Sequence, residues 1–375
     1  MELFNESGAY SSLGDLSTVM DDLDVAAQII FVVGGESFVQ SGAADLLGQL
    51  SQHDPRLVAP IVRLVGSRPS AADYVTFLAG LKVAEWKRDK AIVLIAVGGG
   101  RVIDGAKIIA HYWLADNPAS RSAINIIAVP STAGSGSEAT RFAVCWEGGR
   151  KMSLDHEGLK PRAAILDHRL CISASVYQLA TSGVDALCQG IEALLNVNAV
   201  SQSDEFARQA ISTALVVLPL LTARRDNESM QSMLCASHFA GRAINVTRTT
   251  APHAFSYYLT SEFGISHGHA VALGMANYLE LFSNEIDRCD DLKMAYGPKL
   301  VWLKAQLDPN NLGFAKAWDC FLESIGLEPT LDRTYLEPLP KVITPKLDMD
   351  RLAKSPISRI LSDNTHMYRL DSDRR

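Results

Sequence analysis

The chain has 375 residues, of which 47% are hydrophobic and 21% charged, and its formal net charge is -7. This length favours two domains over a single core, and the negative charge without a basic stripe argues against a nucleic-acid partner. The acidic first residues do not form a secretory signal, no apolar run reaches membrane-spanning length, and the six scattered cysteines form no CxxC pair. We therefore expect reduced thiols, no membrane partner and a cytoplasmic protein.

The first half of the chain alternates strand-like and helical runs. Buried-strand patterns are predicted at 27–33, 60–65, 91–97 and 124–129, and helical patterns at 13–23, 41–52, 71–86 and 102–114. This alternation indicates a parallel sheet that is covered by helices on both faces.

After about Leu166 the strand-like runs disappear, and only helical periodicity remains. Helices are predicted at 183–195, 203–221, 230–243, 269–283 and 312–324. We place a domain boundary near 167–175, which predicts an α/β domain at 1–170 and an all-α domain at 171–375. The tail from about Leu327 shows no pattern that places it.

Two loops rich in small residues follow predicted strands. The first, Gly98-Gly99-Gly100, opens a predicted helix, and the second spans 130–138 and offers several hydroxyl groups. Glycines at a helix start let backbone N–H groups approach a phosphate. Loops at the carboxyl ends of parallel strands are where a nucleotide binds, although a tight turn or a Ser/Gly-rich surface loop gives the same pattern.

Three of the nine histidines lie close together in the sequence, at His253, His267 and His269. On one unbroken helix His253 and His267 would lie about 20 Å apart, too far to share an ion. Gly264 lies between them and predicts a helix break that can bring both rings to one point. Imidazole is a common ligand of zinc and iron, but core or helix-end histidines give the same pattern.

Taken together, these motifs resemble the iron-dependent alcohol dehydrogenase family, whose fold is related to dehydroquinate synthase. The matching segments occur in the order of the family and are GGGRVIDGAK (98–107), VPSTAGSGSEAT (129–140), KPRAAILD (160–167), SGVDALCQGIEALL (182–195), APHAFSYYL (251–259) and GISHGHAVAL (264–273). The resemblance implies an α/β dinucleotide-binding domain at the N-terminus, an all-α domain that holds metal and substrate at the C-terminus, and an active site in the cleft between them. The cofactor-binding residues that we expect are Gly34, Gly35, Gly98, Gly99, Gly100, Asp104, Lys107, Ser131, Thr132, Ser135 and Ser137.

The resemblance also implies a divalent metal, Fe²⁺ in the first place and Zn²⁺ as the alternative. The family holds it with a carboxylate and three histidines, which correspond here to Asp185, Gln189, His253 and His267. Gln189 departs from the family, because a histidine is expected there. Its carbonyl oxygen either ligates the ion as a harder, weaker donor than imidazole or hydrogen-bonds a ligand. A second departure is Tyr257, where many relatives have a further histidine.

One branch of the family, the phosphonoacetaldehyde reductases, shares the glutamine of the 182–195 segment and a run similar to 248–257. For this branch the resemblance implies reduction of phosphonoacetaldehyde to 2-hydroxyethylphosphonate. The cations beside the family motifs that can bind such an anion are Arg141, Lys151, His156 and Arg248. We favour Arg141 and Lys151, although each of the four can also be a solvated surface charge.

The expected activity is metal-dependent reduction of a small aldehyde to a primary alcohol with NADH or NADPH. No aspartate follows the strand at 27–33, so NADP use is allowed, and Glu36 can take the place of the aspartate. Tyr257 and His269 are candidate proton donors, and both can equally be structural. The alternatives are a lyase or cyclase similar to dehydroquinate synthase and a nucleotide-binding relative that has lost its metal. The resemblance also implies a homo-oligomer, often a dimer.

Overall fold

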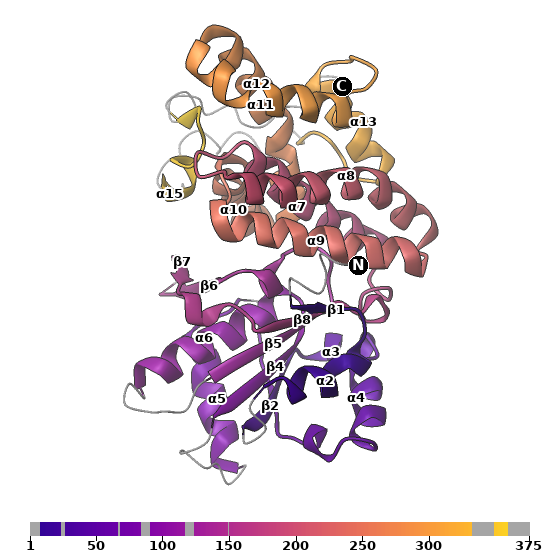
Figure 1. The fold of residues 1–375 in the computed structure, drawn as a ribbon, viewed down its shortest axis with the longest axis vertical. Helices are drawn as coiled ribbons and strands as arrows, with labels where there is room; N and C mark the ends of the chain where they lie inside the picture. Colours follow the sequence, from indigo (N-terminus) through magenta and orange to yellow (C-terminus); the bar gives the residue numbers. More distant parts are fainter. Residues whose placement is uncertain are drawn as a thin grey trace. The chain divides into compact units, whose positions relative to one another are not determined.

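The structure is a computed structural model that describes residues 8–23, 27–66, 68–83, 91–116, 124–148, 150–331 and 349–358. The chain divides into two compact units, Met1–Ala174 and Ser175–Arg375 (Figure 1). We call them the sheet unit and the helical unit, and each is described by itself.

Within the described residues of the sheet unit, six parallel strands form one sheet in the order β1-β8-β5-β4-β2-β3. The strands are β1 (Ala9–Tyr10), β2 (Gln28–Val33), β3 (Ile61–Arg63), β4 (Ile92–Gly98), β5 (Ile124–Pro130) and β8 (Ala163–Ile165). From β2 the chain adds β3 on one side and then crosses to add β4 on the other. The junction of β2 and β4 is therefore the topological switch point of the sheet.

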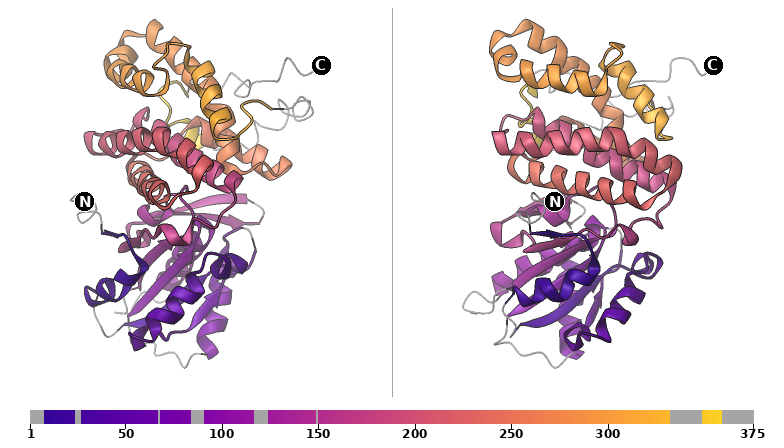
Figure 2. Two further views of the ribbon diagram at one scale, coloured as in Figure 1. Left: turned by 90° about the vertical axis from the view of Figure 1, so that its right-hand side faces the viewer. Right: turned by 45° about the vertical axis from the view of Figure 1, so that its right-hand side comes forward.

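Helices cover both faces of this sheet, as its sequence pattern predicts (Figures 1 and 2). Side chains alternate along β2, so that Ile30 and Val32 face one core cluster while Phe31 and Val33 face the other. The first cluster is completed by α5 (Ala71–Val83) and α6 (Gly100–Asp116). The second is completed by α2 (Leu16–Asp21), α3 (Glu36–Gln40) and α4 (Ala43–Ser51).

Several features of the sheet unit differ from the prediction. The helix predicted at 41–52 is preceded by α3 and separated from it at Gly42, whose φ of 77° is in the left-handed region. The sequence patterns missed β1, β8 and the antiparallel hairpin of β6 (Phe142–Glu147) and β7 (Arg150–Asp155). The helical run predicted at 13–23 consists of the 3-10 turn η1 (Leu13–Asp15) followed by α2. The patterns missed the short 3-10 turns η2 (Pro55–Leu57), η3 (Ser137–Ala139), η4 (Glu157–Leu159) and η5 (His168–Leu170).

The described part of the helical unit consists of helices, as predicted. They are α7 (Val176–Leu194), α8 (Ser201–Arg224), α9 (Asn227–Thr247), α10 (Ala251–Phe263), α11 (His267–Arg288), α12 (Asp290–Leu307), α13 (Phe314–Ser324) and α15 (Met349–Leu352). α7 packs against α8, α9 and α11, and its side chains are buried on nearly every side. It is therefore the central helix of this unit.

Helix α8 corrects one expectation from the sequence. It is long and apolar enough to cross a membrane, whereas the sequence analysis found no run of that length. In the structure one side of it packs against α7 and α9. All six cysteines are free thiols, which agrees with the prediction of reduced cysteines.

Candidate metal centre

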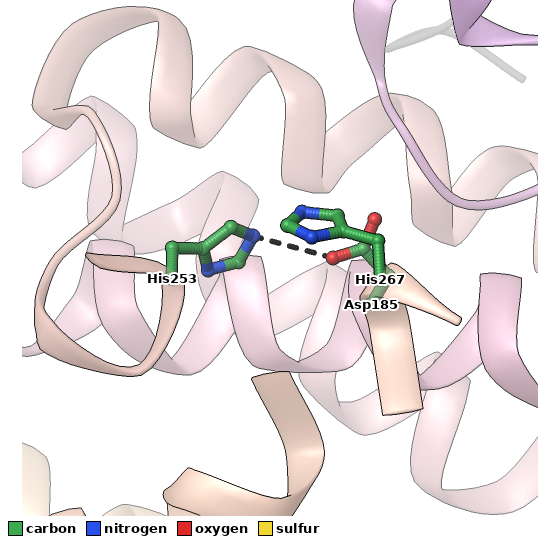
Figure 3. Close-up of side chains that lie close together, drawn as sticks. All are labelled: Asp185, His253 and His267. Atoms are coloured by element: carbon green, nitrogen blue, oxygen red, sulfur yellow. Dashed lines mark ion pairs between the residues drawn. The ribbon is translucent and has the colours of Figure 1, made fainter. Parts of the chain in front are cut away.

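Three side chains from three helices converge in the helical unit. Asp185 comes from α7, His253 from the first turn of α10, and His267 is the first residue of α11 (Figure 3). One potential ligand atom of each residue lies within 4.8 Å of those of the other two. Residues that are far apart in the sequence therefore offer one carboxylate and two imidazoles to a common point.

Local sequence explains how the two histidines come together. Gly264 ends α10 with a φ of 67°, and α11 begins three residues later at His267. The predicted helix break is thus confirmed, and it places the rings of His253 and His267 with their centroids 5.4 Å apart. Glycine suits this turn because it adopts positive φ without steric cost.

A second glycine allows α11 to approach α7. A Cβ atom on Gly268 would collide with the carbonyl oxygen of Thr181 and would lie 2.9 Å from the Cβ of Asp185. Only a residue without a side chain permits this separation of the two helices. The close approach brings His267, the neighbour of Gly268, to the face of α7 that carries Asp185.

His253 lies between two carboxylates of α7. Its Nε2 is 3.2 Å from Oδ1 of Asp185, and its Nδ1 contacts Oε2 of Glu192. Burial favours the neutral ring, but the negative charge of Glu192, with a smaller contribution from Asp185, outweighs this effect and raises the pKa of His253. The carboxylates also offset the positive ends of the α10 and α11 dipoles, which would otherwise disfavour a cation.

His267 is held by contacts to α10. Its Nδ1 lies 3.4 Å from the hydroxyl of Ser256, which itself donates to the carbonyl oxygen of His253. The Ser256 oxygen therefore accepts from Nδ1–H, which leaves Nε2 of His267 as the nitrogen with the lone pair. The ring also stacks on Tyr257 at a centroid distance of 5.8 Å and an interplanar angle of 6°.

This donor set fits a divalent transition metal. One carboxylate and two imidazoles are the ligands that Fe²⁺ and Zn²⁺ commonly take in proteins. Asp185 is 8% exposed and His253 is 3% exposed, so the set is largely screened from water. A single carboxylate in direct reach also offsets part of the charge of such an ion.

Gln189 lies one helical turn after Asp185 on α7 and is 3% exposed. Asp185 and Gln189 thus form the i, i+4 pair that the predicted metal site requires. Ligation of the ion by the side-chain oxygen of Gln189 stays a prediction. Between them lies Cys188, whose pKa burial raises well above the usual value, with further contributions from Glu192 and Asp185. Cys188 therefore remains a thiol rather than a thiolate ligand.

The two candidate proton donors differ in their surroundings. Tyr257 contacts a ligand of the cluster through its stack with His267. His269 uses Nε2 to donate to the carbonyl oxygen of Glu328 at 2.8 Å, and its Nδ1 lies 3.4 Å from the hydroxyl of Tyr177. Burial lowers the pKa of His269, and both ring nitrogens are engaged, so its contacts are those of a structural residue.

The glycine loops of the sheet unit lie at the switch point of the sheet. Gly34 directly follows β2, and Gly98 ends β4. A Cβ on Gly34 would lie 2.9 Å from the Ser37 hydroxyl oxygen, and one on Gly98 would lie 2.5 Å from Cγ2 of Val102 of α6. A Cβ on Gly100 would lie 2.7 Å from the Ser135 hydroxyl oxygen, so the second loop packs directly on the first. These strand ends are where open α/β sheets bind nucleotides.

The other predicted cofactor residues divide into two groups. Ser131, Thr132 and Ser135 are half-buried on the second loop, and Gly35 and Gly99 are at least partly accessible beside them. Asp104, Lys107 and Ser137 instead bond to one another and to the neighbouring backbone. The Lys107 ammonium group donates to Ser137 O, Ser137 Oγ, Thr140 Oγ1 and Phe142 O, and Asp104 accepts from Ser137 Oγ and Val144 N. This second group braces the loop from within.

The cations proposed for an anionic substrate also differ in placement. Arg141 forms ion pairs with Asp155 at 2.8 Å and Glu157 at 2.6 Å in the sheet unit. His156 caps η4 by accepting from Gly158 N, and Arg248 ends α9 with a φ of 69°. The side chain of Lys151 lies outside the described residues.

Two residues that the sequence analysis did not select lie beside the cluster. Glu192 contacts His253, and it falls on the same face of α7 as Asp185 and Gln189 by its i+7 spacing, which is the signal that could have found it. Arg351 of α15 places its guanidinium carbon 5.4 Å from the ring centroid of Tyr257. No sequence pattern could have placed Arg351, because it lies in the tail without periodicity.

A parallel sheet with glycine loops at its switch point and a helical unit that gathers metal ligands together define a class of two-unit dehydrogenases. The family model described as "Iron-containing alcohol dehydrogenase" matches residues 6–168, and the one described as "Fe-containing alcohol dehydrogenase family, C-terminal" matches 179–332. The chain therefore belongs to the iron-containing alcohol dehydrogenase family.

Individual relatives agree with this membership. The phosphonoacetaldehyde reductase of Streptomyces viridochromogenes is 33% identical over 273 residues, which cover 68% of this chain and 67% of that protein. The probable alcohol dehydrogenase EutG of Escherichia coli is 34% identical over 212 residues, 53% of each protein. The chain thus aligns with about half the length of the second relative.

Solved structures share the fold along nearly the whole chain. The sulfoacetaldehyde reductase of Bifidobacterium kashiwanohense, solved in complex with NAD+, matches with a TM-score of 0.77 at 24% identity and covers 96% of both chains. The iron-containing alcohol dehydrogenase of Thermotoga maritima matches with a TM-score of 0.73 at 24% identity, over 95% of this chain and 97% of that chain.

Proposed function

We propose that the protein is a metal-dependent, NAD(P)H-linked reductase that converts a small aldehyde to its primary alcohol. The observation that carries this proposal is the convergence of Asp185, His253 and His267 within 4.8 Å. Membership of an iron-containing dehydrogenase family supports the same function. The cluster also disfavours the alternative of a relative that has lost its metal site.

In the proposed reaction, Asp185, His253 and His267 would hold a divalent ion, which would supply Lewis-acid polarisation of the aldehyde carbonyl. The glycine loops at Gly34, Gly98 and Gly100 would bind the dinucleotide, which would supply the hydride. Asp185 supplies negative charge next to the ion, and the buried position of His253 excludes water from that side. Tyr257, which stacks on His267, remains the candidate donor of the proton.

We further propose that the aldehyde carries a small anionic group. The curated relative acts on phosphonoacetaldehyde by its name, and the solved neighbour is a sulfoacetaldehyde reductase. In the helical unit, Arg351 lies over Tyr257, which in turn stacks on the ligand His267. This places a guanidinium group near the cluster, and guanidinium groups bind such oxyanions well.

Rates of aldehyde reduction test the function. We expect activity that depends on added Fe²⁺ or Zn²⁺ and on NADH or NADPH, and a higher kcat/KM for phosphonoacetaldehyde than for propionaldehyde. An ion-loaded protein that reduces no aldehyde with either cofactor would contradict the proposal. The same assay shows whether NADH or NADPH is preferred, since the sequence, with Glu36 in place of an aspartate, allows both.

Two arginine variants test the anionic group. Arg351→Ala should raise the KM for phosphonoacetaldehyde about 10- to 100-fold while changing that for propionaldehyde little, because a lost charge-assisted contact contributes about 1.5–3 kcal/mol. Arg141→Ala should have a small effect on both, since Arg141 is already paired with Asp155 and Glu157 near the surface. A larger effect of Arg141→Ala than of Arg351→Ala on the KM for phosphonoacetaldehyde would instead favour Arg141 and Lys151 as the residues that bind the anionic group.

We also propose that the chain acts as a cytoplasmic homodimer. The free cysteines suit a reducing compartment, and the resemblance to the family implies a homo-oligomer, often a dimer. Sedimentation analysis at micromolar concentration distinguishes a dimer from a monomer.

A further inference from the structure

The buried carboxylate of Glu192 has no role in the function described so far. It lies in the last turns of α7, seven residues after Asp185, and its side chain is fully buried. A carboxylate in such a place is costly unless donors surround it. The groups that contact the Glu192 carboxylate therefore indicate its structural role.

One oxygen of Glu192 binds the start of α10. Oε1 accepts from the Thr250 backbone N–H at 2.8 Å, from the Thr250 hydroxyl at 3.0 Å and from the His253 backbone N–H at 3.3 Å. Thr250 is the N-cap residue of α10, and its own side chain forms no capping bond. Glu192 thus supplies from α7 the cap that α10 lacks locally, at the helix end where negative charge is favourable.

The other oxygen of Glu192 binds the ring of His253. Oε2 contacts Nδ1, while Asp185 lies at Nε2 on the opposite edge of the same ring. Since a carboxylate only accepts, Nδ1 must carry the proton, and Nε2 keeps its lone pair for an ion. One side chain therefore fixes the backbone that carries His253, the orientation of its ring and its tautomer.

We infer that Glu192 is a positioning residue of the metal centre, which sets the affinity for the ion by holding His253 in its ligating tautomer and orientation. The inference rests on the proposed function, because it needs an ion at Asp185, His253 and His267. A carboxylate behind a ligating imidazole typically changes metal affinity about 10–100-fold. Glu192 also caps α10, so one side chain fixes both the His253 ring and the start of the helix that carries it.

The test measures binding of Co²⁺ to the full-length protein without substrate or cofactor, by its visible absorption and by competition with a chelator. Glu192→Gln keeps the size of the side chain, but its one carbonyl oxygen cannot serve both the α10 start and Nδ1–H. We expect the Kd for Co²⁺ to rise about 10–100-fold and the absorption bands of bound Co²⁺ to shift.

Asp308→Asn provides the matched control. Asp308 is a buried carboxylate of the same unit that also accepts two backbone N–H groups, from Leu312 at 2.6 Å and Gly313 at 2.9 Å. Both of these bonds lie at the start of α13, and among the described residues Asp308 forms no hydrogen bond or ion pair with Asp185, His253 or His267. This variant loses the same charge and should lose stability, yet its Kd and absorption bands should match those of the unchanged protein.

Each outcome decides the inference. Equal Co²⁺ affinity and spectra for Glu192→Gln and the unchanged protein would overturn the inference about Glu192 and leave the proposed function intact. An equal loss of Co²⁺ affinity in Glu192→Gln and Asp308→Asn would have the same consequence. An unchanged protein that binds no Co²⁺ would overturn both. If Glu192→Gln does not fold, Glu192→Asp serves instead: it keeps the charge but withdraws the carboxylate, so we expect at least a threefold rise in Kd, and an unchanged Kd overturns the inference.

Discussion

The sheet unit and the helical unit present their functional groups in different ways. In the sheet unit the proposed cofactor-binding surface is mainly backbone: Gly34 follows β2, Gly98 ends β4 and Gly100 begins α6, and a Cβ on Gly98 or Gly100 would clash with a neighbouring side chain. In the helical unit the proposed metal ligands are side chains, which reach one point from α7, α10 and α11. The first arrangement follows from strand order, and the second depends on how three helices pack.

This difference predicts different sensitivities. A backbone surface tolerates changes in side chains that do not fill it, provided that the loop keeps its shape. A convergent set of side chains loses its function when any one helix shifts, because misplacement by about 1 Å can weaken a site strongly. Substitutions in the helical unit should therefore act on ion binding, and those in the sheet unit on cofactor binding.

The largest effect is expected from removal of a ligand. His267→Ala should abolish stoichiometric ion binding and lower the rate of aldehyde reduction by about three orders of magnitude, because the ion contributes several kcal/mol to catalysis. Metal content per chain and kcat measure both effects. His53→Ala, which removes an exposed histidine of the sheet unit, is the control and should change neither. A His267→Ala protein that retains one ion per chain would refute the assignment.

The next effect concerns the brace under the loop of the sheet unit. Lys107→Met leaves the acceptors at Ser137, Thr140 and Phe142 without their buried donor, which should cost about 3 kcal/mol of stability and weaken NADH binding. Denaturant unfolding and NADH titration measure these losses. Ion affinity should stay unchanged, as should all three quantities in Lys316→Met, an exposed lysine of α13. Loss of ion affinity in Lys107→Met would break the proposed division of roles.

A pair of glycine substitutions compares the packing of the two units. Gly268→Ala forces α11 away from Thr181 and Asp185, which should cost about 1–3 kcal/mol and weaken ion binding. Gly48→Ala lies on an exposed position of α4 with nothing within 4 Å, and it should stabilise the protein by up to about 1 kcal/mol. Thermal unfolding with and without ion compares them. Equal stability and ion affinity in both variants would show that the close approach of α7 and α11 is not required.

The smallest effect is that of pH on ion binding. The raised pKa of His253 means that the ion-free protein keeps a proton there to a pH above the usual value near ~6.5. That proton stabilises the ion-free protein below about pH 6.5, and the contribution is lost as the pH rises through the raised pKa. Since an ion must displace the proton, affinity should rise about tenfold per pH unit below the raised pKa. A flat profile between about pH 6 and 7 would contradict the effect of Glu192 on His253.

The sequence predicted the parts of the molecule that depend on local pattern. The runs that became β2, β4 and β5 are almost entirely apolar, and Gly264 marked the break that brings the histidines together. It missed β8, because three residues inside a longer motif give no periodicity. It also missed Glu192, although the i+7 spacing from Asp185 places Glu192 on the same face of α7. Contact between that face and the start of α10 is visible only in the structure.

The metal ligands themselves illustrate the same limit. Spacing alone allowed His253 and His267 to be core histidines, and the inclusion of Asp185 rested on resemblance to a family. Convergence of residues so distant in sequence is a tertiary property, which the structure supplies through Gly264 and Gly268.

The most direct test is anomalous diffraction from crystals of the protein grown with Zn²⁺. The account predicts one strong peak in the helical unit, about 2.0–2.2 Å from a carboxylate oxygen of Asp185 and from a ring nitrogen of both His253 and His267. The same map shows whether the Gln189 oxygen is a fourth ligand. A peak bound elsewhere, or no peak within bonding distance of these three side chains, would contradict the account.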